Sequence, residues 1–228
     1  MRNSLLTVAL LLTSNMSYAY ENAPFEGWYA GANVGWAEGT TQDNYNPSSD
    51  ERDLEGNIGG LQVGYNWQLV NNIVLGIEGG LSLSDIEDEN GGNLEGNNEW
   101  YGNSEIKNTA NLNLKIGYAF YNWLPYVTTG LTVASMDYMS GCQSNGQSMG
   151  SDCETPFESS ADDFRVGYNV GAGVQYKFMD SFSAAIEYSY TDLGESTANL
   201  YDPNFPKYSR VDYETKFQTM TLRINYHF

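Results

Sequence analysis

Apolar and polar side chains alternate along most of the chain, in eight separate segments. The clearest covers 164–178, where Phe164 and Val166 alternate with Arg165 and Gly167, and the pattern continues to the end of the segment. A period of two is the spacing of side chains on the two faces of a β-strand. The pattern therefore predicts strands over 28–37, 58–69, 73–84, 111–120, 124–136, 164–178, 182–192 and 214–228.

The connections between these segments are alternately short and long. Tight turns are expected near 70–72, 121–123 and 179–181. Long polar loops are expected over 38–57, 85–110, 137–163 and 193–213. Such an order is typical of an all-β, up-and-down antiparallel barrel with unequal ends, in which both termini lie on the short-turn side.

The N-terminus has a different pattern. Arg2 precedes an apolar run over residues 5–12, and small residues, Ser17 and Ala19, follow it. These features are typical of a secretory signal peptide, and the run is too short for the alternative, a retained anchor helix, which needs about 20 apolar residues. We predict a signal peptide over 1–19 and one β-barrel domain over 20–228.

Alternation alone leaves open whether the apolar face of each strand points out of the barrel or into its interior. A soluble barrel has an apolar interior, whereas a membrane barrel has an apolar exterior. Each apolar row here holds about five residues, as in a tilted strand of 9–11 residues that crosses a bilayer. The opposite face carries mainly Gly, Ser, Asn, Gln and Ala, which suit the crowded interior of an eight-stranded barrel.

Aromatic residues fall into two groups that favour the membrane barrel. The group near the short turns comprises Trp28, Trp67, Tyr118, Phe120, Trp123, Phe178, Phe182, Tyr226 and Phe228. The group near the long loops comprises Trp36, Tyr138, Phe164, Tyr190 and Phe217. Because aromatic belts form at both bilayer interfaces, we predict an eight-stranded transmembrane β-barrel with short periplasmic turns and four long external loops.

Six charged residues lie on the inward parity of their strands, and Arg165 and Lys177 are among them. Glu78, Lys115, Glu187 and Arg223 each lie five residues from the short-turn end of the segment. A buried charge without a partner is costly, so we expect Glu78 to pair with Lys115 and Glu187 with Arg223. Arg165 lies nearer the long loops. These charges form either a satisfied plug or the lining of a narrow pore, and the small interior of eight strands favours the plug.

The composition excludes several classes of function. The net charge of −19 and the pI near 4.1 argue against a nucleic-acid partner. The one histidine, His227, lies at the short-turn rim, so a Ser–His site near the outer leaflet is not expected, and we expect no enzyme activity and no cofactor. The acidic run 85–93 lacks the spacing of an EF-hand, so no metal site is expected.

Two cysteines, Cys142 and Cys153, lie in the third long loop. Exported proteins fold in an oxidising compartment, where an isolated pair at this spacing forms a disulfide. We therefore expect one bridge that restrains the loop.

Several short motifs resemble one known family over essentially the whole mature chain. They are Gly27–Gly31 (GWYAG), Leu124–Thr128 (LPYVT), Gly167–Val174 (GYNVGAGV), Glu187–Tyr188, Asp192–Gly194 (DLG) and the terminal Tyr226–Phe228 (YHF). In order and spacing they resemble small Gram-negative outer-membrane barrels of the OmpA-like and opacity-protein type. The resemblance implies that the outer-membrane assembly machinery reads the C-terminal alternation of Leu222, Ile224, Tyr226 and Phe228.

The resemblance also implies a cellular location, the outer membrane, and does not imply a catalytic activity. Members of this family are structural envelope proteins, adhesins, surface antigens or narrow pores. We expect an outer-membrane barrel with a structural role whose acidic loops serve interaction or adhesion, and the alternative is a narrow pore for small solutes. The expected partners are outer-membrane lipid and lipopolysaccharide, the assembly machinery and an external ligand at the loops, and we expect a monomer.

Overall fold

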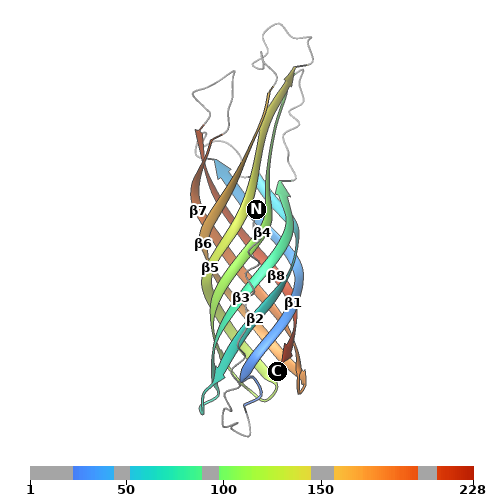
Figure 1. The fold of residues 1–228 in the computed structure, drawn as a ribbon, viewed down its shortest axis with the longest axis vertical. Coiled ribbons are helices and arrows are strands. Elements are labelled where there is room, and N and C mark those ends of the chain that lie inside the picture. Colours follow the sequence, from blue (N-terminus) through green and yellow to red (C-terminus); the bar gives the residue numbers. More distant parts are fainter. Residues whose placement is uncertain (1–22, 44–51, 89–97, 145–156, 200–209) are drawn as a thin grey trace, which may run out of the picture.

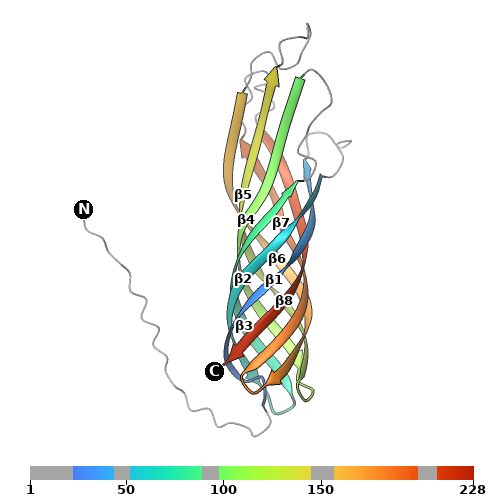
Figure 2. The same cartoon turned by 90° about the vertical axis from the view of Figure 1, so that its right-hand side faces the viewer.

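The computed structural model of this chain describes residues 23–43, 52–88, 98–144, 157–199 and 210–228. It contains eight strands: β1 (Gly27–Asp43), β2 (Arg52–Gln68), β3 (Ile73–Asp88), β4 (Asn98–Tyr118), β5 (Trp123–Ser144), β6 (Phe157–Met179), β7 (Phe182–Asn199) and β8 (Arg210–His227). Each strand pairs antiparallel with the next, and β8 pairs with β1, so the sheet closes into a barrel (Figures 1 and 2). The predicted fold class is confirmed.

The strands reach further toward the long loops than the alternation predicted. The largest difference is in β4, which begins 13 residues before the predicted start of the segment at residue 111. In Figure 2 β4, β5 and β6 project beyond the other strands. Apolar side chains such as Ile86 and Ile106 are buried in these extensions, and the register shifts between Ile106 and Asn108, so the period-two pattern is interrupted while the backbone pairing continues.

Short turns join three pairs of strands at the predicted positions. Between β2 and β3, the Leu69 N–H donates to the Ile73 carbonyl at 2.8 Å, and Asn72 has a φ of 65°. Asparagine is one of the residues that adopts this left-handed region most readily. Tyr121, between β4 and β5, has a φ of 52°. Only two residues separate β6 from β7.

The wall of the barrel is apolar outside, and most of the side chains that face the lumen are polar. In β8, Leu222 and Ile224 are exposed on the outer face, whereas Arg223 and Asn225 are buried in the lumen. The other strands follow the same rule with the parity predicted from the sequence. No helix in the described part of the chain is long and apolar enough to cross a bilayer.

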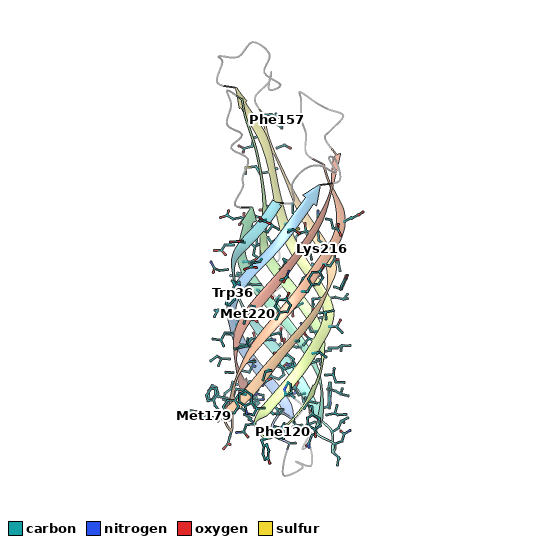
Figure 3. The ribbon with its side chains drawn as sticks, turned by 180° about the vertical axis from the view of Figure 1, so that it is seen from behind. Trp36, Phe120, Phe157, Met179, Lys216 and Met220 are labelled. Atoms are coloured by element: carbon teal, nitrogen blue, oxygen red, sulfur yellow. The ribbon has the colours of Figure 1, made fainter. Side chains whose placement is uncertain are left out.

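Aromatic side chains surround the short-turn end of the wall. All nine residues predicted for this girdle are exposed on the outer face. Figure 3 shows Phe120 and Met179 at this end, Trp36 and Met220 higher on the wall, and Lys216 higher still.

The predicted second girdle is only partly correct. Trp36 and Phe164 are exposed on the wall, and Tyr190 is half-buried. The side chain of Tyr138 lies outside the described residues. Phe217 was assigned wrongly, because it is 3% exposed and faces the lumen. It shares the parity of Arg223, and in a strand parity decides the face whatever the character of the side chain.

The closed barrel predicts resistance to detergent. Every strand edge is paired, including that between β1 and β8, so SDS finds no open edge at which unfolding starts. We expect the unheated protein to migrate differently from the boiled protein on SDS gels. Identical mobility before and after boiling would contradict a closed membrane barrel.

Candidate functional site

A cluster of buried ions crosses the middle of the lumen. The two terminal nitrogens of Arg223 bind two different carboxylates. Its Nη1 donates to Oε2 of Glu187 at 2.6 Å, and its Nη2 donates to Oε1 of Glu78 at 2.5 Å. All three residues are buried. Arg223 on β8 therefore joins β3 to β7 across the interior.

Lys115 completes the cluster from β4. Its Nζ lies 3.5 Å from Oε2 of Glu78 and donates to the Tyr29 hydroxyl at 2.8 Å. Tyr29 in turn donates to Oε2 of Glu78 at 2.7 Å. The ammonium group also lies 4.9 Å from the centre of the Tyr126 ring. Two carboxylates thus face two cations, and the cluster has no net formal charge.

Two glycines make room for the tyrosines beneath these ions. A Cβ at Gly64 would lie 2.5 Å from the Tyr29 ring, and a Cβ at Gly173 would lie 2.6 Å from the Tyr126 hydroxyl. These positions accept no side chain unless a tyrosine moves. Gly64 and Gly173 therefore belong to the site.

The structure brings together the four charged residues that were expected to pair, whereas Arg165 and Lys177, also of inward parity, lie elsewhere in the lumen. Glu78 lies beside Lys115 and Glu187 beside Arg223, as the sequence suggested. The contact between Arg223 and Glu78 was not foreseen. The roles of Tyr29 and Tyr126 were also missed, although both stand at inward parity among small polar residues.

Arg165 lies apart from the cluster, toward the long-loop end. Its Nη1 donates to Oγ1 of Thr215 at 3.3 Å. Thr215 is also hydrogen-bonded to Thr41, at 2.8 Å between the two hydroxyl oxygens. The sequence placed Arg165 near this end of the lumen.

The short-turn end of the lumen is closed by the segment before β1. Phe25 is fully buried and packs with Val74, Ala119, Leu124 and Tyr126. The Phe25 N–H donates to the side-chain oxygen of Gln68 at 3.1 Å. Asn66 donates to the Phe25 carbonyl at 3.2 Å, and Lys177 donates to the carbonyl of Pro24. The segment before β1 thus forms a floor to the lumen, which hydrogen bonds fasten to the strands of the wall.

His227 fills part of the same floor. Its Nε2 lies 2.9 Å from the hydroxyl of Ser183, which accepts a hydrogen bond from Gln175 at 2.7 Å. All three side chains are buried. Within the described residues, Nδ1 of His227 has no hydrogen-bond partner. A serine nucleophile needs a base that a third group orients, and the described residues place no such group at Nδ1.

Above the ions, the lumen holds polar side chains and then an apolar layer. Asn169 donates to Asn113 and to Thr132, both at 2.9 Å. A cavity of about 70 Å³ lies among these polar groups, which is room for a few waters at roughly 10–15 Å³ each. The apolar layer near the long-loop end comprises Ala37, Leu54, Ile86, Ile106, Ala134, Met136, Leu193 and Phe217.

The acidic residues form no obvious metal site where they are described. Among the described residues, no group of three or more His, Cys, Asp or Glu side chains is placed to hold a metal ion. Part of the acidic run 85–93 lies outside the described residues.

The predicted disulfide also falls outside the described residues. The backbone of Cys142 pairs with Phe157 near the end of β5, while Cys153 lies in 145–156. We expect the unfolded, unreduced protein to bind no thiol reagent, and the reduced protein to bind two equivalents. A ring of this size restrains the unfolded chain by about 3 kcal/mol in the chain-entropy account. Two reactive thiols before reduction would contradict the bridge.

An apolar outer wall, a belt of aromatic residues and a lumen of paired ions define an integral outer-membrane β-barrel. Strands that cross a bilayer must satisfy every backbone group, and the closed pairing of β1 to β8 does so. The chain belongs to the family described as outer membrane protein beta-barrel domain, whose model matches residues 6–228. The protein is therefore a bacterial outer-membrane protein that crosses the membrane with its strands.

Curated relatives have the same location in their names. The 31 kDa outer-membrane immunogenic protein of Brucella melitensis biotype 1 is 28% identical over 217 residues, which cover 89% of this chain and 83% of the relative. The 22 kDa outer membrane protein of Rhizobium leguminosarum bv. viciae is 28% identical over 183 residues, which cover 80% of this chain and 71% of the relative.

Among solved structures, this chain is similar to Neisserial surface protein A. The sequence identity is 11% and the TM-score is 0.47, and the match covers 89% of this chain and 98% of the other.

Proposed function

We propose that this protein is a closed structural barrel of the outer membrane that holds acidic loops at the cell surface. In this arrangement the short turns face the periplasm and the long loops face outward, as in other bacterial membrane barrels. The barrel itself contributes mechanical continuity to the envelope, and the loops carry whatever specificity the protein has.

The observation that carries this proposal is the filled lumen. From the periplasmic end, a solute meets the floor around Phe25, then the ions around Arg223, and then the apolar layer that includes Phe217. The polar cavity between the ions and the apolar layer has a volume of only about 70 Å³. An eight-stranded barrel leaves an interior that side chains just fill.

The test is conduction through a planar bilayer. We expect the full-length protein to leave the bilayer insulating, while a 16-stranded porin inserted under the same conditions conducts, since its lumen holds an aqueous channel. Liposome swelling with small sugars should agree. Regular single-channel steps from the purified protein would favour the alternative, a narrow pore for small solutes.

The alternative rests on one specific observation. The ions and the small cavity form a polar path through the middle of the barrel, between the two apolar layers. A pore would require Arg223 to leave at least one carboxylate and both apolar layers to open. Breaking one partner from a buried pair costs about 3–5 kcal/mol, so this state would be rarely populated.

The loops are the proposed site of interaction. The names of the Brucella relatives describe immunogenic proteins, which supports loops that are accessible at the surface. The relevant experiment compares intact cells that carry the full protein with cells that carry variants shortened within 145–156 or 200–209. We expect the shortened variants to lose binding of the ligand or antibody. They should keep the difference in gel mobility between unheated and boiled samples, which shows that the barrel is folded. Equal binding by all variants would remove the loops from the proposal.

The remaining partners are proposed on the chemistry of the wall. Outer-membrane lipid and lipopolysaccharide would surround its apolar face. The assembly machinery would read the C-terminal strand, where Leu222, Ile224, Tyr226 and Phe228 are all exposed on the outer face. We propose no catalytic role, because the Ser183–His227 pair is enclosed in the floor and its base lacks an orienting group within the described residues.

A further inference from the structure

The outer wall of the barrel has an apolar hollow across β2 to β6. Its volume is about 460 Å³, within the range of roughly 300–1,000 Å³ found for small-molecule sites. Gly59 and Ala110 form part of its base, and Leu61, Leu81, Val133 and Phe164 rise around them. Phe164 is 76% exposed, which is more than most aromatic side chains of the wall.

The hollow is not a requirement of the barrel's own packing. A Cβ added at Gly59 would meet no heavy atom closer than 3.6 Å. At Gly79, an outward glycine in the next strand that does not line the hollow, the nearest atom would lie at 3.9 Å. Many inward glycines differ, because a Cβ at Gly31 or Gly35 would collide with backbone. A larger side chain at Gly59 would therefore fit, and the empty space is free for a ligand.

The part of the hollow on β2, β3 and β4 lies in the half of the membrane next to the long loops. Leu81 lies eight residues above the start of β3 at Ile73. At about 3.3 Å per residue and a tilt near 40°, this is roughly 20 Å above the short-turn end, in an apolar band about 25 Å tall. With the orientation proposed above, the hollow opens into the outer leaflet.

One end of the hollow is polar. Asn108 and Ser135 lie opposite each other in the register of β4 and β5, and both line the hollow. Asn108 lies ten residues from the end of β4 at Tyr118, roughly 25 Å up by the same conversion and thus at the upper edge of the apolar band. An amide and a hydroxyl at this depth match the ester or amide linkages at which a lipid changes from hydrocarbon to head group.

A lipid chain fits this shape better than a second copy of the protein. A stable protein interface needs about 800 Å² and 20–30 residues from each partner, whereas twelve residues line the hollow. A barrel wall is also convex and cannot fill a concave surface. In the bilayer no water is present to fill the space, and lining atoms without neighbours lose dispersion energy.

We propose that this hollow is a lipid-binding site that holds one acyl chain of an outer-leaflet lipid. The chain lies between Leu61, Leu81 and Val133, with its linkage groups at Asn108 and Ser135. Phe164, 15 residues from the end of β6 at Met179 and roughly 38 Å up by the same conversion, lies above them at the level of the head group. The inference uses the proposed orientation only to name the leaflet.

Photolabelling in a bilayer tests the proposal. The full-length protein is inserted into phosphatidylethanolamine–phosphatidylglycerol vesicles that contain a small fraction of phospholipid with a diazirine in the middle of one acyl chain. After illumination, the adducts are mapped by peptide mass spectrometry. We expect adducts to concentrate on the residues of the hollow, above their level at Leu114, which is 62% exposed elsewhere on the wall.

A matched pair of variants separates the hollow from the general effect of a larger wall side chain. Gly59→Leu occupies the base of the hollow, and Gly79→Leu adds the same side chain on the adjoining strand outside it. We expect Gly59→Leu to reduce labelling of the hollow about tenfold, since each displaced methylene weakens binding about fourfold. Gly79→Leu should leave it unchanged. If Gly59→Leu does not fold, Ala110→Leu, which adds a larger side chain at the base of the hollow, should produce the same loss.

Three outcomes would overturn the proposal. They are even labelling around the wall, equal loss in the two glycine variants, and a dimer in native mass spectrometry that Gly59→Leu abolishes. The labelling pattern is independent of conduction and of loop binding, so failure here is distinct from failure of the proposed function.

Discussion

Replacing Arg223 with alanine should lower the free energy of unfolding of the membrane-inserted protein by about 3–5 kcal/mol, the usual cost of removing one partner from a buried ion pair. Arg223 is bonded to both Glu187 and Glu78, so its loss leaves two buried carboxylates facing one cation, Lys115. The measurement is a urea titration in lipid vesicles, followed by the heat-dependent shift in gel mobility. Midpoint and slope together give the change in free energy.

The double variant Glu187→Ala with Arg223→Ala shows whether the loss comes from unpaired charge. It removes one acid and one base, and Glu78 keeps its contacts with Lys115 and Tyr29. We expect a smaller loss of stability per substituted residue than in Arg223→Ala alone. Lys216→Ala is the control, since Lys216 pairs with Glu214 near the surface at 2.5 Å and such exposed pairs contribute little. If Arg223→Ala unfolded at the same urea concentration as the wild type, the cluster would not stabilise the barrel.

An arginine on the outer wall should also be strongly destabilising. Leu114 is exposed on the outer face four residues from the end of β4, between Ile77 and Thr129 in the register. This is roughly 10 Å above the short-turn end, close to the middle of the apolar band. We expect Leu114→Arg to cost about 2–4 kcal/mol in the same urea titration, the value for arginine near the midplane on the lipid face of a barrel.

Val70→Arg is the matched control for depth. Val70 is 79% exposed in the turn between β2 and β3, at the edge of the wall. The cost of arginine falls to about 0–1 kcal/mol near the interface, so this variant should unfold close to the wild type. Equal effects of Leu114→Arg and Val70→Arg would mean that Leu114 does not face hydrocarbon.

The sequence by itself determined the number of strands, the inside-out polarity of the wall and the parity of the charged residues that form the cluster. The physical reason is local, because successive side chains of a strand point to opposite faces whatever the rest of the fold does. Glu78 and Arg223 could thus be assigned to the lumen from their own segments. Phe217 is the one residue clearly assigned to the wrong face. It was placed on the outer face because it is aromatic, although its parity in the strand places it in the lumen.

Only the tertiary structure decided which side chains contact one another in the lumen and on the outer face of the wall. Arg223 reaches Glu78 although β1 and β2 stand between their strands, because closure brings distant strands together across the lumen. Phe25 closes the floor from outside any strand, so no periodicity marks it. The hollow beside Phe164 combines residues from five strands. Which of these residues come together depends on the stagger of the register, which each strand acquires only from its neighbours when the barrel closes.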